Sequence, residues 1–163
     1  MKEDMIFKGR FLFIAALLLS MGSIQMANAA TDNNIDKQVV IKFFEQAYNK
    51  QNYQYVLEHF KRDYIEHSPN GARSNQDAVH ILKMAHKIFT DLTAHVDSVV
   101  ADHGVVAVRV TFSGVNTGTF FGVGPTHKKI SWEAMEFFTL EHGVIAESWG
   151  SWPIYDMLKK LQA

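Results

Sequence analysis

The sequence predicts an α+β fold, in which helices pack against one face of an antiparallel sheet. Three segments with apolar residues at helical spacing come first, and four stretches of alternating apolar and polar residues follow. Such an order is typical of α+β domains. The chain has 163 residues, of which 47% are hydrophobic and 20% charged, values that suit one globular domain and exclude a disordered or collagen-like chain.

The helical part is expected to contain three helices. The first follows a polar leader at 31–35 and covers about 36–49, and the second covers about 53–60. The short connection between them predicts a helical hairpin. Tyr64 and Ile65 suit a brief extended piece. The third helix should run over about 75–89, because Ser74 stands three residues before Asp77 in a capping arrangement.

The strands are expected at about 93–101, 105–113, 130–140 and 144–152. Short Gly-containing turns join the first two and the last two as antiparallel hairpins, and a longer Gly-rich segment at 116–129 connects the hairpins. Pro153 then suits the first turn of a closing helix.

Charge and cysteine content exclude several classes of function. Sixteen basic and seventeen acidic residues give a net charge of −1, which leaves no basic excess for nucleic acid. The absence of cysteine excludes disulfides, thiolate metal sites and a cysteine nucleophile. His80 and His86 lie six residues apart, whereas one helix face needs a spacing of four, so no metal is predicted. We expect no cofactor either.

Residues 1–29 have the layout of a secretory signal peptide. Basic residues precede the apolar run Phe11 to Leu19, and small residues ending in Ala27-Asn28-Ala29 follow it. We predict cleavage after Ala29, export to a bacterial periplasm, and no stable membrane association of the remaining domain at 30–163. The alternative is an uncleaved N-terminal anchor, although polar residues dilute the second half of the segment.

Several short strings stand in a characteristic order and spacing. They are YIEHSPNG at 64–71, AVR at 107–109, TGTFFG at 117–122, PTHK at 125–128 and HGVIAESW at 142–149. Together they resemble motifs of the SnoaL-like polyketide cyclase group of the nuclear transport factor 2-like superfamily. The resemblance implies a cone-shaped, curved antiparallel sheet wrapped by helices around an open pocket, and a homodimer formed by packing sheet against sheet. The fold hosts many reactions, so it does not identify one.

One departure from the family concerns the reaction itself. Cyclases of this group typically carry an acid–base Asp four residues after the Trp of the last strand, and the matching residue here is Pro153. Proline transfers no proton. Asp156 follows three residues later and is a candidate for a substitute, provided that the turn from strand to helix is shifted.

His67 is the first catalytic candidate, because it lies between a short strand and a Pro-Gly turn and titrates near neutral pH. The alternative is a hydrogen bond to a loop carbonyl. Arg109 is expected to bind an anionic ligand or, more simply, to form an ion pair with Glu133 or Glu136. These two glutamates differ by three positions and therefore lie on opposite faces of a strand. Glu136, which shares a face with Trp132, is a candidate for a buried acid or base.

Aromatic side chains are expected to line the pocket, although packing in the core explains them equally well. The candidate ligand-binding residues, with Arg109, are Tyr64, Phe121, Trp132, Trp149 and Trp152.

Two functions remain open at this point. The first is a cofactor-free enzyme that moves a proton on a small, mostly apolar carbonyl compound, using His67 and one buried carboxylate, as in cyclisation, isomerisation or dehydration. The second is a non-catalytic module that binds a hydrophobic molecule or forms a dimer, which the proline at position 153 favours. A carboxylate within reach of the pocket would favour the enzyme, and a pocket without one would favour the non-catalytic module.

Overall fold

The computed structural model describes residues 31–163, and the predicted signal peptide lies outside these residues. Residues 31–43 are α-helical. The elements that follow are η1 (Phe44–Asn49), α2 (Gln54–His59), β1 (Phe60–Glu66), α3 (Asn75–Ile88), β2 (Phe89–Asp102), β3 (Val105–Asn116), β4 (Lys129–Glu141), β5 (Val144–Ser151) and α4 (Ile154–Gln162). None of the helices described is long and apolar enough to cross a membrane.

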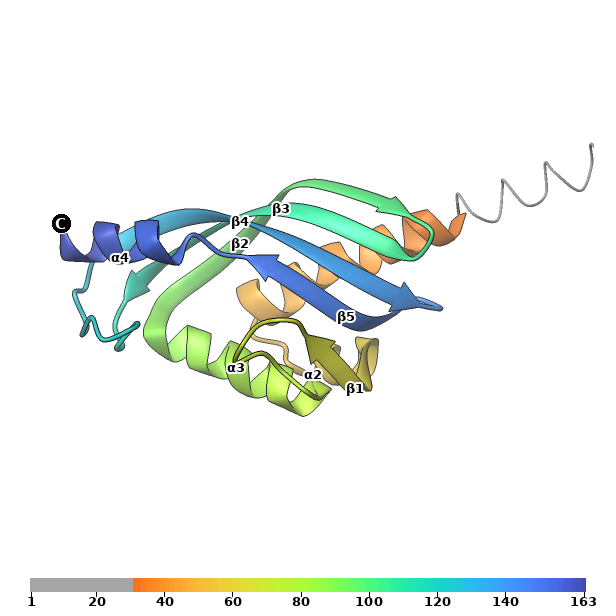
Figure 1. The fold of residues 1–163 in the computed structure, drawn as a ribbon, viewed down its shortest axis with the longest axis horizontal. Helices are drawn as coiled ribbons and strands as arrows, with labels where there is room; N and C mark the ends of the chain where they lie inside the picture. The colour runs from red at the N-terminus through yellow and green to blue at the C-terminus, as the bar shows by residue number, and fades with distance from the viewer. Residues whose placement is uncertain (1–30) are drawn as a thin grey trace, which may run out of the picture.

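The strands form one five-stranded sheet in the order β1-β5-β4-β3-β2. All neighbouring pairs are antiparallel except β1 and β5, which are parallel. The α+β fold class is confirmed, with β1 as a parallel edge strand beside four antiparallel strands. The curved strands extend past the N-terminal helix and α3, with α4 at one end of the molecule and the β2–β3 turn at the other (Figure 1).

The sheet has one buried and one exposed face. Along β4, Ile130, Trp132, Ala134, Glu136, Phe138 and Leu140 are buried, whereas the residues between them are mostly exposed. On β3 the same pattern buries Val106, Val108, Val110 and Phe112. The predicted alternation is therefore confirmed, including the opposite placement of Glu133 and Glu136.

The first helix begins earlier than predicted, because residues 31–35 are helical rather than a polar leader. Ile35 in this segment lies beside Gly143 of the β4–β5 turn. Residues 32–36 and the two hairpin turns also line a common cavity of about 470 Å³. The local sequence did not predict this contact with the hairpin turns, and so it did not predict the earlier start of the helix.

The same helix ends in the π-helical turn η1, where the backbone N–H of Lys50 donates to the Glu45 carbonyl. The wider turn brings Asn49 to β2, where its Nδ2 donates to the Ala94 carbonyl (2.9 Å) and its Oδ1 accepts from the Ala94 N–H (2.7 Å). β2 is irregular on both sides of this contact, between Thr90 and Thr93 and between Val96 and Ser98. Such irregularities bend a strand, and here they help the sheet to curve around the helices.

The remaining differences concern element ends. Phe60–Glu66 is a full strand rather than a brief extended piece, and the second helix ends at His59. β2 starts at Phe89, directly after α3. Pro153 is the residue before α4 rather than part of its first turn. Fraying and pairing partners decide such boundaries, which local patterns do not encode.

Asn116 organises the loop between β3 and β4. Its side chain is fully buried; Oδ1 accepts from the Thr126 N–H (2.9 Å) and hydroxyl (3.1 Å), and Nδ2 donates to the Gly118 carbonyl (2.7 Å). The Asn116 carbonyl also accepts from the His127 N–H, so the loop folds back onto the end of the strand.

We predict that Asn116→Ala lowers the free energy of unfolding by about 3 kcal/mol, because it leaves several polar groups of the loop without partners. Urea denaturation followed by circular dichroism measures the change. Asn70→Ala removes an exposed amide and is the matched control, with an expected change below about 0.5 kcal/mol. Equal stability losses in the two variants would contradict this role of Asn116.

Candidate functional site

Two neighbouring cavities lie between the buried face of the sheet and the helices. The first, the Glu136 chamber, has a volume of about 230 Å³, and its lining residues with side-chain oxygens are Tyr48, Tyr64, Glu66, Glu136 and Ser148. The second, the apolar chamber, has a volume of about 300 Å³ and is lined by residues that include Phe89, Phe112, Phe120, Trp132 and Met157. Tyr48, Ile81, Ala85 and Trp152 line both. The two chambers therefore adjoin each other.

Glu136 is the central titratable group of the first chamber. Its side chain is buried, and within residues 31–163 it has neither a hydrogen-bond partner nor an ion-pair partner. Burial, and secondarily the charge of Glu66, raises the pKa of Glu136 to about 8. A carboxyl group with such a pKa exists in both protonation states near neutral pH, which suits a general acid or base.

Gly150 on β5 makes room for this carboxyl group. A Cβ atom at position 150 would lie 2.8 Å from Nε1 of Trp152 and 3.7 Å from Cγ of Glu136. The first distance is too short for a side chain without a shift of the indole. Glycine therefore allows Trp152 to lie close to the strand at the boundary between the chambers.

Tyr64 and Ser148 supply hydroxyl groups to the same chamber, and their side-chain oxygens are hydrogen-bonded to each other. Burial raises the pKa of Tyr64, and the pKa of Tyr48 is also raised, first by burial and then by the charge of Glu136. Both phenols thus keep their protons at neutral pH. A protonated phenol beside a carboxyl group can donate a hydrogen bond to a carbonyl oxygen.

Trp132 carries an unpaired donor. Its indole Nε1 is the one fully buried side-chain nitrogen or oxygen without a hydrogen-bond partner in the described part of the chain. The ring lines the apolar chamber and packs against Phe112, with ring centroids 5.7 Å apart. An unsatisfied buried donor costs on the order of 1–3 kcal/mol.

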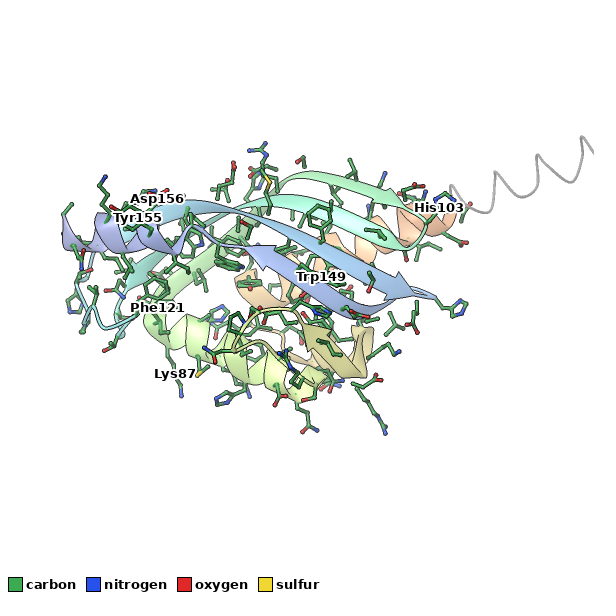
Figure 2. All side chains as sticks on the ribbon, viewed as in Figure 1. Lys87, His103, Phe121, Trp149, Tyr155 and Asp156 are labelled. Carbon is green, nitrogen blue, oxygen red and sulfur yellow. The ribbon has the colours of Figure 1, made fainter. Side chains whose placement is uncertain are left out.

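His67 lies outside both chambers. Its Nε2 is 2.6 Å from Oε2 of Glu147, and its ring stacks on Trp149 with a centroid separation of 4.3 Å. Glu147 and Trp149 belong to β5, and His67 directly follows β1, the neighbouring strand. All three side chains are partly exposed on the outer face of the sheet. Figure 2 shows Trp149 on this strand. The structure therefore does not bring His67 together with Glu136, and the nearby carboxylate is Glu147.

Arg109 also faces outward. Its guanidinium is 2.7 Å from Glu133 Oε2 and 3.7 Å from Asp97 Oδ2, so the expected ion pair forms with Glu133. Asp156 is exposed on α4 and lines neither chamber (Figure 2). Phe121 lies at the rim of the apolar chamber with 70% of its surface exposed.

Of the residues singled out from the sequence, the structure brings together Tyr64, Trp132, Glu136 and Trp152 in the chambers. Sequence reasoning missed Tyr48, Glu66, Ser148 and Gly150. Glu66 is adjacent to His67, but on a strand neighbouring residues point to opposite faces. Ser148 and Gly150 alternate with Glu147 and Trp149 on β5, a signal that the sequence contains but does not assign to a face.

Comparison with known proteins adds the family. Residues 38–162 match the family model described as SnoaL-like polyketide cyclase. The chain belongs to this family. A search of curated proteins finds no match.

Solved structures show the same fold for this member of the SnoaL-like family. TsrD from Streptomyces laurentii has a TM-score of 0.74 and 21% identity, covering 80% of this chain and 96% of that one. A SnoaL-like polyketide cyclase, described as putative, from Jannaschia sp. CCS1 has a TM-score of 0.74 and 18% identity, covering 81% and 94%. AclR from Streptomyces galilaeus, described as a putative hydroxylase, has a TM-score of 0.68 and 27% identity, covering 78% and 95%.

We predict a pH-dependent stability that originates from Glu136. Because its pKa is about 8 in the folded protein and 4.5 in a free side chain, the folded state retains a proton that the unfolded state loses between these values. The free energy of unfolding should therefore fall as pH rises through this window, by at most about 1.4 kcal/mol per pH unit.

Glu136→Gln has no proton to release, so its free energy of unfolding should fall less between about pH 5 and about pH 8. Urea denaturation at several pH values measures both slopes. Glu133→Gln, on the exposed face of the same strand, is the control and should keep the wild-type slope. Equal slopes for wild type and Glu136→Gln would refute the raised pKa.

Proposed function

We propose that the chain is an acid–base enzyme of the cyclase, isomerase or dehydratase type, which acts on a small, mostly apolar carbonyl compound. The observation that supports it best is the buried, unpaired carboxyl group of Glu136 in a chamber beside two hydroxyl groups. Such chemistry needs proton transfer at a carbon next to a carbonyl group and no cofactor.

In the proposed reaction, the substrate carbonyl lies in the Glu136 chamber and accepts a hydrogen bond from the hydroxyl pair of Tyr64 and Ser148. The Glu136 carboxylate removes a proton from the adjacent carbon, and the electron pair of that C–H bond forms the C=C bond of an enol or enolate. Glu136 then returns its proton to the product. With a pKa of about 8, the Glu136 carboxyl group is ionised in about one tenth of the protein molecules at pH 7.

The alternative is a non-catalytic binding module. It is favoured by Pro153, which stands where the resemblance places the acid–base Asp of the family's cyclases. Both functions use the same chambers, so the test that distinguishes the two functions is whether the protein transfers a proton.

The test is hydrogen–deuterium exchange on 2-tetralone, a bicyclic ketone with acidic protons beside its carbonyl, followed by NMR. We expect exchange above the buffer rate that increases as the pH approaches about 8, since the base is the carboxylate. Glu136→Gln should reduce the enzymatic rate at least about 100-fold. His67→Ala and Asp156→Asn are controls with the wild-type rate.

Exchange at the buffer rate would favour the binding module. Exchange that survives in Glu136→Gln but is lost in His67→Ala would transfer the catalytic role to the outer face of β5.

We also propose a homodimer that forms through the exposed face of the sheet. Val100, Ala107, Phe137 and Trp149 are direct cross-strand neighbours, so they form a row across β2, β3, β4 and β5. Exposure is 65% for Val100, 51% for Phe137 and 39% for Trp149. Contiguous apolar surface of this kind is typical of interaction sites.

Phe137→Glu should therefore shift the protein from dimer to monomer, because it places a charge in the centre of the row. Sedimentation velocity at micromolar concentration measures the change. Lys129→Glu is the control, because it changes a charge on the same face of β4 but eight residues from Phe137. This variant should stay dimeric. A monomeric wild-type protein would refute the proposal.

Export is proposed as well, on the sequence pattern of residues 1–29. Expression of the full chain in a bacterium should yield periplasmic protein whose intact mass corresponds to a chain that begins at Ala30. A full-length mass in the membrane fraction would indicate an uncleaved anchor instead.

A further inference from the structure

Glu66 is a second carboxyl group of the Glu136 chamber, and the proposed reaction leaves it without a role. It is the last residue of β1 and lies on the same face of that strand as Tyr64, which also lines the chamber. Tyr64 is buried, whereas Glu66 is partly exposed. Glu66 therefore borders both the chamber and the solvent.

The loop after β1 fixes the backbone at Glu66. The Glu66 N–H donates to the Ala72 carbonyl (3.0 Å), and the Glu66 carbonyl accepts from Nη1 of Arg73 (2.6 Å). A Cβ atom at Gly71 would collide with the same carbonyl oxygen, so only glycine allows this close approach. Of the carboxylate oxygens, Oε1 accepts from the Ser68 hydroxyl (2.8 Å), and Oε2 has no hydrogen-bond or ion-pair partner among residues 31–163. The carboxylate thus keeps an acceptor for water.

The sheet places Glu66 and Glu136 on either side of β5. Glu66 pairs in register with Ser148, and Glu136 pairs with Gly150, two residues further along the same strand. All four residues line the one chamber. The charge of Glu66 contributes to the raised pKa of Glu136, as expected for two carboxyl groups that share a chamber.

The carboxyl group of Glu136 is accessible to water in the chamber. It has no hydrogen-bond partner, yet the one fully buried and unpaired side-chain nitrogen or oxygen in the described part of the chain belongs to Trp132. The residue as a whole is only 7% exposed, so bulk solvent does not reach it freely. A proton on Glu136 therefore needs a route to the solvent.

The elements around Glu136 offer few groups for such a route. Tyr64 and Glu66 face it from β1 and Tyr48 from η1, while Arg73 lies behind Glu66 and binds its backbone. The residues of α3 that line the chamber carry no titratable group; they are Ala78, Ile81, Leu82 and Ala85. Both phenols keep their protons, because the pKa of each is raised. Apart from Glu136 itself, Glu66 is the one carboxylate among the described lining residues.

We propose that Glu66 is the proton outlet of the site, which exchanges protons between Glu136 and the solvent through water on the Glu66 side of the chamber. Protonated Glu136 gives its proton to this water, the water passes a proton to the Glu66 carboxylate, and Glu66 releases a proton to the solvent. Glu136 is then a carboxylate again, and Glu66 is unchanged. Glu66 acts through Glu136 and not on the substrate, so it is a positioning residue, and its role rests on the proposed function.

The experiment follows the proton that Glu136 removes. The probe is 3-cyclohexenone, whose isomerisation to 2-cyclohexenone moves a proton from the carbon between the carbonyl and the C=C bond to the far end of that bond. In deuterium oxide, a proton that stays on Glu136 is returned as protium, whereas a proton that leaves through Glu66 is replaced by deuterium. NMR of the product gives the ratio of deuterium to protium at the receiving carbon, and ultraviolet absorbance gives the rate.

We expect Glu66→Gln to lower the ratio of deuterium to protium at least about fivefold, while the isomerisation rate falls less than about threefold. Exchange on 2-tetralone should fall by the same factor as the ratio. The midpoint of the rate–pH profile should move to lower pH, because the charge that helps to raise the pKa of Glu136 is gone.

Two further variants separate the carboxylate from the shape of the side chain. Glu66→Asp keeps the carboxylate and should restore most of the deuterium uptake, which a merely structural role of Glu66 does not predict. Asp63→Asn removes an exposed carboxylate from the opposite face of β1 and is the matched control, with the wild-type ratio and pH profile.

The outcomes distinguish this inference from the proposed function. Isomerisation or exchange that depends on Glu136, together with unchanged deuterium uptake and an unchanged pH profile in Glu66→Gln, would overturn the role of Glu66 and leave the proposed function intact. A wild-type protein that neither isomerises 3-cyclohexenone nor exchanges protons on 2-tetralone would refute the proposed function and the role of Glu66 with it.

Discussion

The central strand β4, which lies between β3 and β5, fixes the position of each functional group through the alternation of its side chains. Burial of one face places Trp132, Glu136 and Phe138 against the helices. Since the period of a strand is two, Glu133 and Phe137 must then face outward. A shift of β4 by one residue in register would turn Glu136 to the exposed face and Glu133 to the buried face. Trp132 and Glu136 would then no longer line the chambers.

Much of this arrangement follows from the sequence. Apolar residues at helical spacing predicted the helices, alternation predicted the strands, and three positions of separation placed Glu133 and Glu136 on opposite faces. What the pattern could not provide is which face is concave. That depends on how β2 bends and on which strand face the helices cover, so His67 and Trp149, expected at the pocket, lie on the outer side of β5.

Tertiary contacts also explain why some boundaries differed. The helix covers residues 31–35 where its first turns meet the hairpin turns, and the π-helical end brings Asn49 onto the backbone of Ala94. β1 extends to Phe60 because it pairs with β5, a partner more than 80 residues later in the chain. Pairing at such separation has no local signature, whereas a capped helix such as α3 has one in Ser74.

The site retains two features that weaken the fold. An unpaired carboxyl group and an unpaired indole N–H each reduce stability when buried, and well-packed apolar side chains would avoid both costs. Trp132 and Glu136 lie four residues apart on one face of β4, one in each of two adjoining chambers. A ligand in the Glu136 chamber would give the carboxyl group a partner. It would also displace water from Glu136, which favours the protonated carboxyl group over the carboxylate. In the proposed reaction Glu136 is protonated once it has removed the substrate proton, so the dry chamber favours the complex of the intermediate over that of the ketone.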